Sequence, residues 1–200
     1  MASRSRKAGL AVLLLLAAMG NASADWRQQA SDNDIARLAQ LDLARARGLQ
    51  AARAGGGRGD ASAIAAALSP QGHAIAESAL PGAWRCRQIK LGGMTSYLVY
   101  GWFDCRIRRV GGGLFFEKRS GGQRTNGFLK PDHGSFVYLG ASNVEGEPAH
   151  RYSGRAASLG PEGTPDDQIG LLSGIGNNHL RLELPAPEQQ SDFDVIELRR

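Results

Sequence analysis

The sequence predicts a mainly β protein, α+β by overall content: a small antiparallel β-barrel or sandwich of about seven to eight strands, preceded by an N-terminal helical arm. Two observations support this prediction. From Ala83 onward, short alternating apolar runs are separated by turns rich in glycine, proline and asparagine. Before Ala83, the chain is rich in alanine and places apolar residues at helical spacing. The pattern leaves open whether the sheet closes into a barrel or splits into a sandwich.

Residues 1–24 have the order of a secretory signal peptide. Three basic residues precede the apolar run GLAVLLLLAAM, and the small residues Ala22, Ser23 and Ala24 follow it. The apolar run, about 11 residues, is shorter than the roughly 20 that a membrane helix needs. We therefore expect cleavage before Asp25, a periplasmic or secreted mature protein, and no transmembrane span after cleavage.

Residues 25–82 form the predicted helical arm and linker. Ser31 precedes an acidic first turn and apolar residues at helical spacing, which predicts one amphipathic helix over 32–53. The run GGGRG then ends this helix, and Asp60 is expected to cap a short alanine-rich helix that stops before Pro70. Residues 71–82 are expected to be a linker.

Residues 83–200 form the predicted antiparallel β domain. Its expected strands are 83–91, 98–110, 114–119, 125–130, 135–141, 168–174, 179–184 and 193–198. Ile107 is expected to lie opposite Phe116, so that both share the core face. The stretch 142–167 has no clean periodicity and is expected to be a long excursion.

The first hairpin of this domain carries the only two cysteines, Cys86 and Cys105. An exported chain with two cysteines is expected to pair them in a disulfide. If they face each other, the hairpin turns at Thr95 and Ser96. A bulge at Gly92 or Gly93 would shift that register by one residue.

The charge is unevenly distributed along the chain. Without the three leader bases, 21 bases stand against 19 acids, a net charge of +2. Residues 85–130 hold ten bases and two acids, whereas 131–200 hold five bases and eleven acids. Either the two halves neutralise one another, or a basic face is kept for an anionic ligand. Nucleic acid is excluded as a partner by the expected export.

No catalytic or metal-binding pattern is evident in the sequence. The four histidines lie far apart without metal-ligand spacing, the cysteines are expected to be bridged, and no nucleophile-elbow motif occurs. Asp192 and Asp194 lie two residues apart, on one face of a predicted strand, where a carboxylate pair could do acid and base work. The preferred interpretation is that both are exposed to solvent. We therefore expect no metal and no cofactor, and we do not expect an enzyme.

One polar cluster is a candidate ligand-binding site: Lys118, Ser120, Gln123 and Arg124. A glycine-rich turn exposes backbone N–H groups, and the flanking cations add charge, so a phosphate or carboxylate fits there. The alternative is a structural turn whose side chains hydrogen-bond a neighbouring loop around Glu145 and Glu147.

The chain resembles the DUF4893 family, exported bacterial proteins of unknown function. The resemblance covers about Trp26 to Leu198 and is most specific between Lys118 and Gly127. It rests on the runs CRQIKLG, FDCRI, LFFEKRSGGQRTNGFLKPD, FVYLG and LRLELPAPEQQSDFDVIEL. The sequence departs from the family pattern at Gly122, where the family has serine; at Ser173 and Gly174, where it has an acidic and a basic residue; and at Leu180, where it has tryptophan. The resemblance implies export and no particular activity.

Two functions are compatible with these observations. The first is a non-catalytic binding or structural module for an anionic envelope component or an envelope protein. The alternative is a hydrolase with a site between the sheet and the 142–167 loop. Binding is preferred because the sequence offers a basic sheet but no pairing of nucleophile and base.

Overall fold

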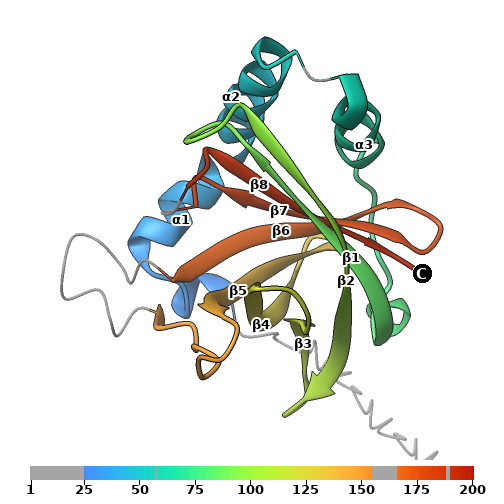
Figure 1. The fold of residues 1–200 in the computed structure, drawn as a ribbon. Helices are drawn as coiled ribbons and strands as arrows, with labels where there is room; N and C mark the ends of the chain where they lie inside the picture. The colour runs from blue at the N-terminus through green and yellow to red at the C-terminus, as the bar shows by residue number, and fades with distance from the viewer. Residues whose placement is uncertain (1–24, 57, 155–165, 188–189) are drawn as a thin grey trace, which may run out of the picture.

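The computed structural model describes residues 25–56, 58–154, 166–187 and 190–200, and its strands close into an antiparallel barrel (Figure 1). Each strand pairs with the next one in the chain, and β1 pairs with β8 to close the sheet. The strands are β1 Gly82–Leu91, β2 Tyr97–Val110, β3 Gly113–Lys118, β4 Gln123–Asp132, β5 Ser135–Val144, β6 Asp167–Gly176, β7 His179–Pro185 and β8 Phe193–Arg199. The choice between barrel and sandwich is thus resolved as a barrel. The predicted leader, 1–24, lies outside the described residues.

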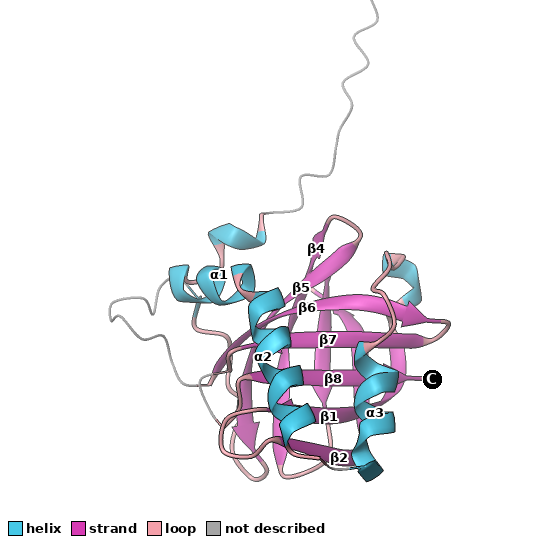
Figure 2. Ribbon diagram, turned by 90° about the horizontal axis from the view of Figure 1, so that it is seen from above, coloured by secondary structure: helices cyan, strands magenta, loops and turns pink. Residues whose placement is uncertain are grey.

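Three helices cover one side of the barrel (Figure 2). They are α1 Asp32–Ala39, α2 Leu41–Ala54 and α3 Arg58–Leu68, with 3-10 turns η1 Trp26–Gln28 and η2 Glu77–Ala79. The predicted single helix over 32–53 is wrong at Gln40, which leaves helical geometry with φ −99° and ψ 15°. The bend lets α1 lie against β6 while α2 follows the curved surface over β7, β8 and β1. Within the described residues, no helix has both the length and the apolar character of a membrane span.

The expected cap of the third helix is also wrong. Helix α3 already begins at Arg58, so Asp60 lies in its first turn. An acid is favourable in that turn because it faces the positive end of the helix dipole. The expected linker 71–82 includes η2 and a bridge from His73 to Gly174 of β6.

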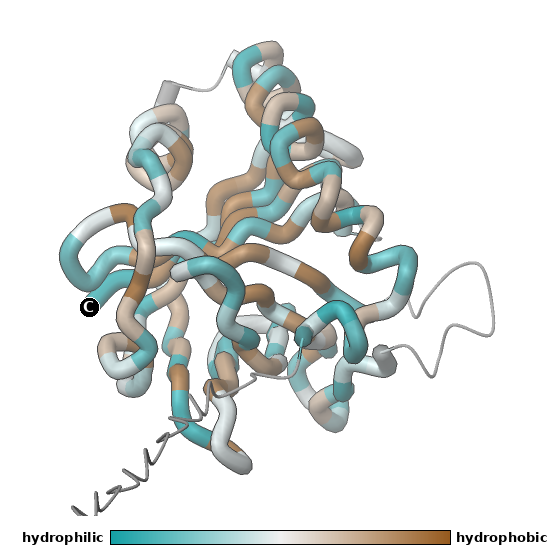
Figure 3. Tube along the Cα trace, turned by 180° about the vertical axis from the view of Figure 1, so that it is seen from behind, coloured by the Kyte–Doolittle hydropathy of each residue, from teal (hydrophilic) through white to brown (hydrophobic). Residues whose placement is uncertain are grey.

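The barrel interior is filled by apolar side chains from all eight strands. Trp84, Ile107, Phe116, Leu182 and Leu198 are among its members, each no more than 4% exposed. In Figure 3, brown segments alternate with teal and pale ones along the strands of the barrel. Residues 88–91 of β1 and nearly all of β8 are buried on both faces, because Ile89, Leu91, Phe193 and Val195 pack outward against α2 and α3.

Cys86 and Cys105 form the expected disulfide, with their Cα atoms 5.8 Å apart, but not in the expected register. Cys105 lies opposite Trp84, and Cys86 lies opposite Phe103, so the bridge is diagonal. The strand pairing shifts between Arg87 and Ile89 rather than at Gly92 or Gly93. Gln88 of β1 lies opposite two residues of β2, Tyr100 and Gly101, so the extra residue of the bulge is on β2. The expected turn at Thr95 and Ser96 is wrong, because Leu91 pairs with Tyr97 and the turn is centred on Met94.

Candidate functional site

A pocket of about 840 Å³ lies on the outer face of strands β3, β4 and β5. We call it the outer pocket. Its other walls are residues 28–29 and the segment 149–154, which belongs to the stretch expected as a long excursion. That stretch is shorter than predicted, because β5 runs to Val144 and β6 starts at Asp167; residues 155–165 lie outside the described residues.

The floor of the outer pocket is aromatic and apolar. Alternation along β3 and β4 points Leu114 and Leu129 into the barrel, so their neighbours Phe115 and Phe128 point outward. The two rings meet edge to face, with centroids 5.0 Å apart. Leu139 of β5 extends this surface. An apolar floor of this kind can hold the hydrocarbon part of a ligand.

Cations surround this floor. Among the residues that line the outer pocket, all of them described, Arg108, Lys130 and Arg151 are cations and none is Asp, Glu, His or Cys. The Arg108 guanidinium lies 5.0 Å from the Phe115 ring centroid, and Lys130 Nζ lies 5.1 Å from that of Phe128. Burial lowers the pKa of Lys130 from its ordinary value. A ligand anion is therefore the group that this lining complements.

The three cations differ in their partners. Arg108 is paired with Glu117, which lies outside the lining, at 3.0 Å. Neither Lys130 nor Arg151 has a carboxylate within ion-pair distance among the described residues. Arg151 is exposed. Two of the three positive charges at the pocket are therefore not neutralised by the described part of the chain.

The wall formed by 149–154 is fixed by buried polar groups. The Tyr152 hydroxyl donates to the carboxylate of Asp34, near the start of α1, and accepts from the Ser31 backbone N–H at 3.1 Å. The Ser153 N–H donates to Asp167 Oδ1 at 3.0 Å. Burial raises the pKa of the Tyr152 hydroxyl, and Asp34 raises it further. The wall is thus held by α1 and β6.

The four predicted site residues lie at the turn between β3 and β4, but the turn uses most of their polar groups internally. Lys118 points into the barrel, is 5% exposed, and donates to the carbonyls of Ser120 and Gln123. Its ammonium lies 4.0 Å from the Phe103 ring centroid. Burial, with smaller effects of the positive charges of Arg124 and Lys90, lowers the pKa of Lys118 to about 8.

Ser120 and Arg124 also have protein partners. The Ser120 hydroxyl accepts from the backbone N–H of Asp104 at 2.8 Å, and Arg124 forms an ion pair with Glu145. This pairing is the one expected if the turn is structural. Ligand binding at the turn stays a prediction.

The aspartate pair does not share one environment. Asp194, expected to be exposed, is 2% exposed and points into the barrel, where it accepts from Gln88 at 3.0 Å and from Ser191 at 2.6 Å. Burial raises its pKa. Asp192 is exposed and accepts from the Gly93 N–H at 3.2 Å. Because Asp194 is enclosed by hydrogen-bond partners, the pair does not form an open acid and base site.

Some bases of residues 85–130 are paired with acids of residues 131–200, as expected if the two segments neutralise one another. Arg87 pairs with Glu197 at 2.5 Å, and Arg124 pairs with Glu145, so bases of 85–130 meet acids of 131–200. Arg109 instead pairs with Glu77 of the helical arm. Sequence reasoning missed the outer pocket, because its cations come from three separate segments that are brought together by the pairing of β2, β3 and β4 and by the 149–154 wall.

Comparison with known proteins places the chain in a family. A search of curated proteins and a search of solved structures each returned no match. The model of a domain of unknown function, DUF4893, matches residues 26–198, which include all described helices and nearly the whole barrel. The match spans well over half of the chain, so the protein belongs to the DUF4893 family.

Proposed function

We propose that the protein is an exported, non-catalytic binding module of the cell envelope that takes an anionic ligand with an aromatic or aliphatic part in the outer pocket. The observation that carries the proposal is the lining: among the described residues, three cations and no carboxylate surround an aromatic floor. A volume of about 840 Å³ is in the range of pockets that hold small molecules. The anion is expected to meet Arg151 and Lys130, and the apolar part to cover Phe115 and Phe128.

The alternative, a hydrolase between the sheet and the 142–167 loop, finds less support in the same pocket. Hydrolysis of an ester or amide needs a nucleophile and a general base within hydrogen-bond reach of each other. In the described part of the chain, the lining holds a serine, Ser153, but no Asp, Glu, His or Cys. The Ser153 hydroxyl donates to Asp167, whose other carboxylate oxygen accepts the Ser153 backbone N–H. This carboxylate supports the loop rather than facing the pocket.

The test uses 1-anilinonaphthalene-8-sulfonate, an aromatic anion, as a fluorescent probe of the mature protein. Arg151→Gln and Lys130→Gln should each weaken probe binding by about two- to fivefold, and added salt should reduce this difference, since a partly exposed charge pair carries the effect. Arg106→Gln is the matched control, because Arg106 is exposed on β2 and does not line the pocket. Equal affinities of all three variants and the wild type would contradict the proposal.

A further arm of this experiment tests the turn predicted from the sequence. Arg124→Gln removes the ion pair with Glu145 but leaves the outer pocket intact. Unchanged probe binding is expected. If Arg124→Gln weakens binding while Arg151→Gln does not, the anion site is the turn and not the outer pocket.

A further inference from the structure

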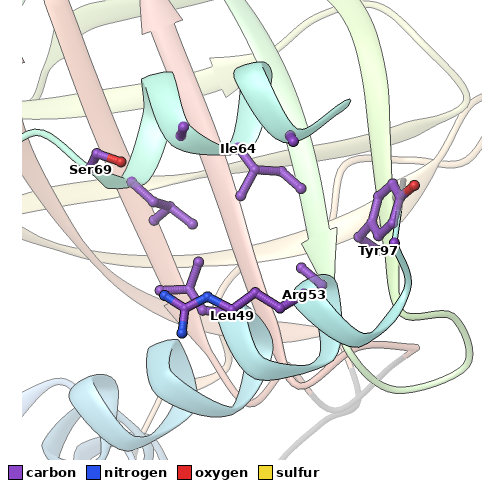
Figure 4. Close-up of a pocket in the computed structure, with 10 residues that line it drawn as sticks. Leu49, Arg53, Ile64, Ser69 and Tyr97 are labelled. Atoms are coloured by element: carbon purple, nitrogen blue, oxygen red, sulfur yellow. The ribbon is translucent and has the colours of Figure 1, made fainter. Parts of the chain in front are cut away.

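A second cavity, of about 570 Å³, forms an apolar groove between helices α2 and α3 (Figure 4). Leu49, Ile64 and Leu68 provide its large apolar side chains. In Figure 4, Leu49 and Arg53 project from α2 toward Ile64 of α3, and Tyr97 and Ser69 stand at opposite ends. The groove is thus an elongated apolar surface with polar groups at both ends.

The groove stays open because its helices present small residues to it. Ala52 of α2 and Ala61 and Ala65 of α3 line it, and the two α3 alanines are exposed. Larger side chains at these positions would fill the space between the helices. Apolar surface left open to water in this way is favourable only when something covers it.

The barrel, rather than contact between the helices, fixes α2. At Gly48 a β-carbon would lie 2.9 Å from the β-carbons of both Leu91 and Phe193, so only glycine lets α2 approach β1 and β8 this closely. At Gly55 a β-carbon would lie 2.6 Å from that of Ser96 in the β1–β2 hairpin.

The barrel also fixes α3, at its C-terminal end. Arg181 of β7, 4% exposed, donates from Nη1 to the carbonyls of Ala67, Leu68 and Pro70 at 3.2, 3.4 and 3.0 Å. Both walls of the groove are therefore preorganised, which lowers the entropic cost of binding.

The groove has a definite charge. Arg53 is the one charged residue in its lining, and no carboxylate lies within ion-pair distance of it among the described residues. Arg53 is exposed. A hydrocarbon chain with an anionic end matches this combination, with the chain on Leu49, Ile64 and Leu68 and the anion at Arg53.

We propose that the α2–α3 groove binds a long-chain fatty acid, with its hydrocarbon chain along the groove and its carboxylate at Arg53. A fatty acid fits the lining because its single carboxylate matches the one guanidinium, and its hydrocarbon chain matches the apolar side chains of Leu49, Ile64 and Leu68. The groove and the outer pocket share no lining residue, so variants of the two sites separate this proposal from the proposed function.

The experiment follows cis-parinaric acid, a fluorescent 18-carbon fatty acid, titrated into the mature protein and displaced by palmitate. Ala65→Trp should fill the groove and weaken binding by on the order of tenfold or more, since the buried chain surface is lost. Ala61→Phe fills the same groove from another position and serves if Ala65→Trp fails to fold. Circular dichroism checks the fold of each variant.

The carboxylate contact is tested with charge variants. Arg53→Gln should weaken parinarate binding by about two- to fivefold and leave displacement by methyl palmitate, which has no carboxylate, unchanged. Arg47→Gln, which changes an exposed arginine on α2 outside the lining, should bind parinarate like the wild type. Weaker parinarate binding by Arg151→Gln but not by Arg53→Gln would place the fatty acid in the outer pocket and overturn the proposal. Wild-type affinity in Ala65→Trp and Ala61→Phe would overturn the proposal. Absence of parinarate binding to the wild type, with or without binding of an amphipathic helical peptide, would overturn it as well.

Discussion

Glu183 and Arg45 form a bidentate ion pair that joins strand β7 to helix α2. Nε and Nη2 of Arg45 lie 2.7 and 2.9 Å from the two carboxylate oxygens of Glu183. The Glu183 side chain is 1% exposed, and Nε of Arg181 lies 3.0 Å from its Oε2. One buried carboxylate is therefore paired with two guanidinium groups. One belongs to Arg45 on α2, and the other to Arg181, which hydrogen-bonds the C-terminal end of α3.

Replacing Glu183 by Gln should lower the free energy of unfolding by about 2 to 4 kcal/mol, because removing one partner leaves buried positive charge without compensation. Asp42→Asn is the matched control. Asp42 lies 3.2 Å from the same Arg45 but its side chain is 94% exposed, so its loss should cost less than about 0.5 kcal/mol. Urea unfolding of both variants measures the difference. Similar stabilities of the two variants would show that α2 is held by apolar packing alone.

The disulfide should contribute strongly to stability, because it crosslinks β1 and β2 inside the barrel. Cys86 and Cys105 are 19 residues apart. In the chain-entropy account, a disulfide that closes a loop of that size raises the free energy of unfolding by about 3 kcal/mol. Dithiothreitol should therefore lower the melting temperature of the wild type and leave that of the double variant C86S/C105S unchanged. An equal melting temperature of the oxidised wild type and the double variant would contradict the expectation.

Gly140→Ala should destabilise the barrel by more than about 3 kcal/mol. A β-carbon at residue 140 would overlap the hydroxyl and ring of Tyr138, which is fully buried and hydrogen-bonded to Thr125 at 2.6 Å. The ring has no free space to move into, and overpacking a close-packed interior is costly. Gly101→Ala is the control, since a β-carbon there meets nothing within 4 Å. Thermal unfolding of both variants compares them, and equal melting temperatures would mean that the Tyr138 ring can shift.

The sequence predicts the strands well because each strand alternates and the turns between them carry glycine, proline or asparagine. The pairing of Ile107 with Phe116, expected from a shared core face, is confirmed. The first hairpin shows where this reasoning fails. Its bulge is on β2, where Tyr100 and Gly101 lie opposite Gln88 of β1. The isolated Gly101 inside this strand is the signal that could have indicated it.

The outer pocket was harder to predict than the strands, for a physical reason. Arg108, Lys130 and Arg151 are separated in the chain, and their approach depends on strand pairing and on the position of the 149–154 wall. The glycine-rich turn at 121–122 was visible in the sequence, but its flanking lysine points inward. Alternation places Lys118 on the same face as Phe116, so the inward direction follows from the register that was predicted correctly.

The buried ammonium of Lys118 should make the stability of the protein depend on pH. Its pKa is about 8 in the folded protein and about 10.5 in the unfolded chain, so between these values the unfolded state holds the proton that the folded state has lost. Stability then rises with pH. Relative to Lys118→Met, which cannot titrate, the wild type should gain about 1 to 3 kcal/mol of unfolding free energy between pH 7 and pH 10.

Urea unfolding of the wild type and Lys118→Met at several pH values from 7 to 10 measures this gain. Burial raises the pKa of Tyr138, but Tyr138 is present in both proteins, so its effect cancels in the difference. If the difference in unfolding free energy between the wild type and Lys118→Met does not change with pH, the hydrogen bonds from Lys118 to the carbonyls of Ser120 and Gln123 offset the burial of its charge. In that case the ammonium would remain protonated throughout this range, and the turn would hold its positive charge inside the barrel rather than release the proton.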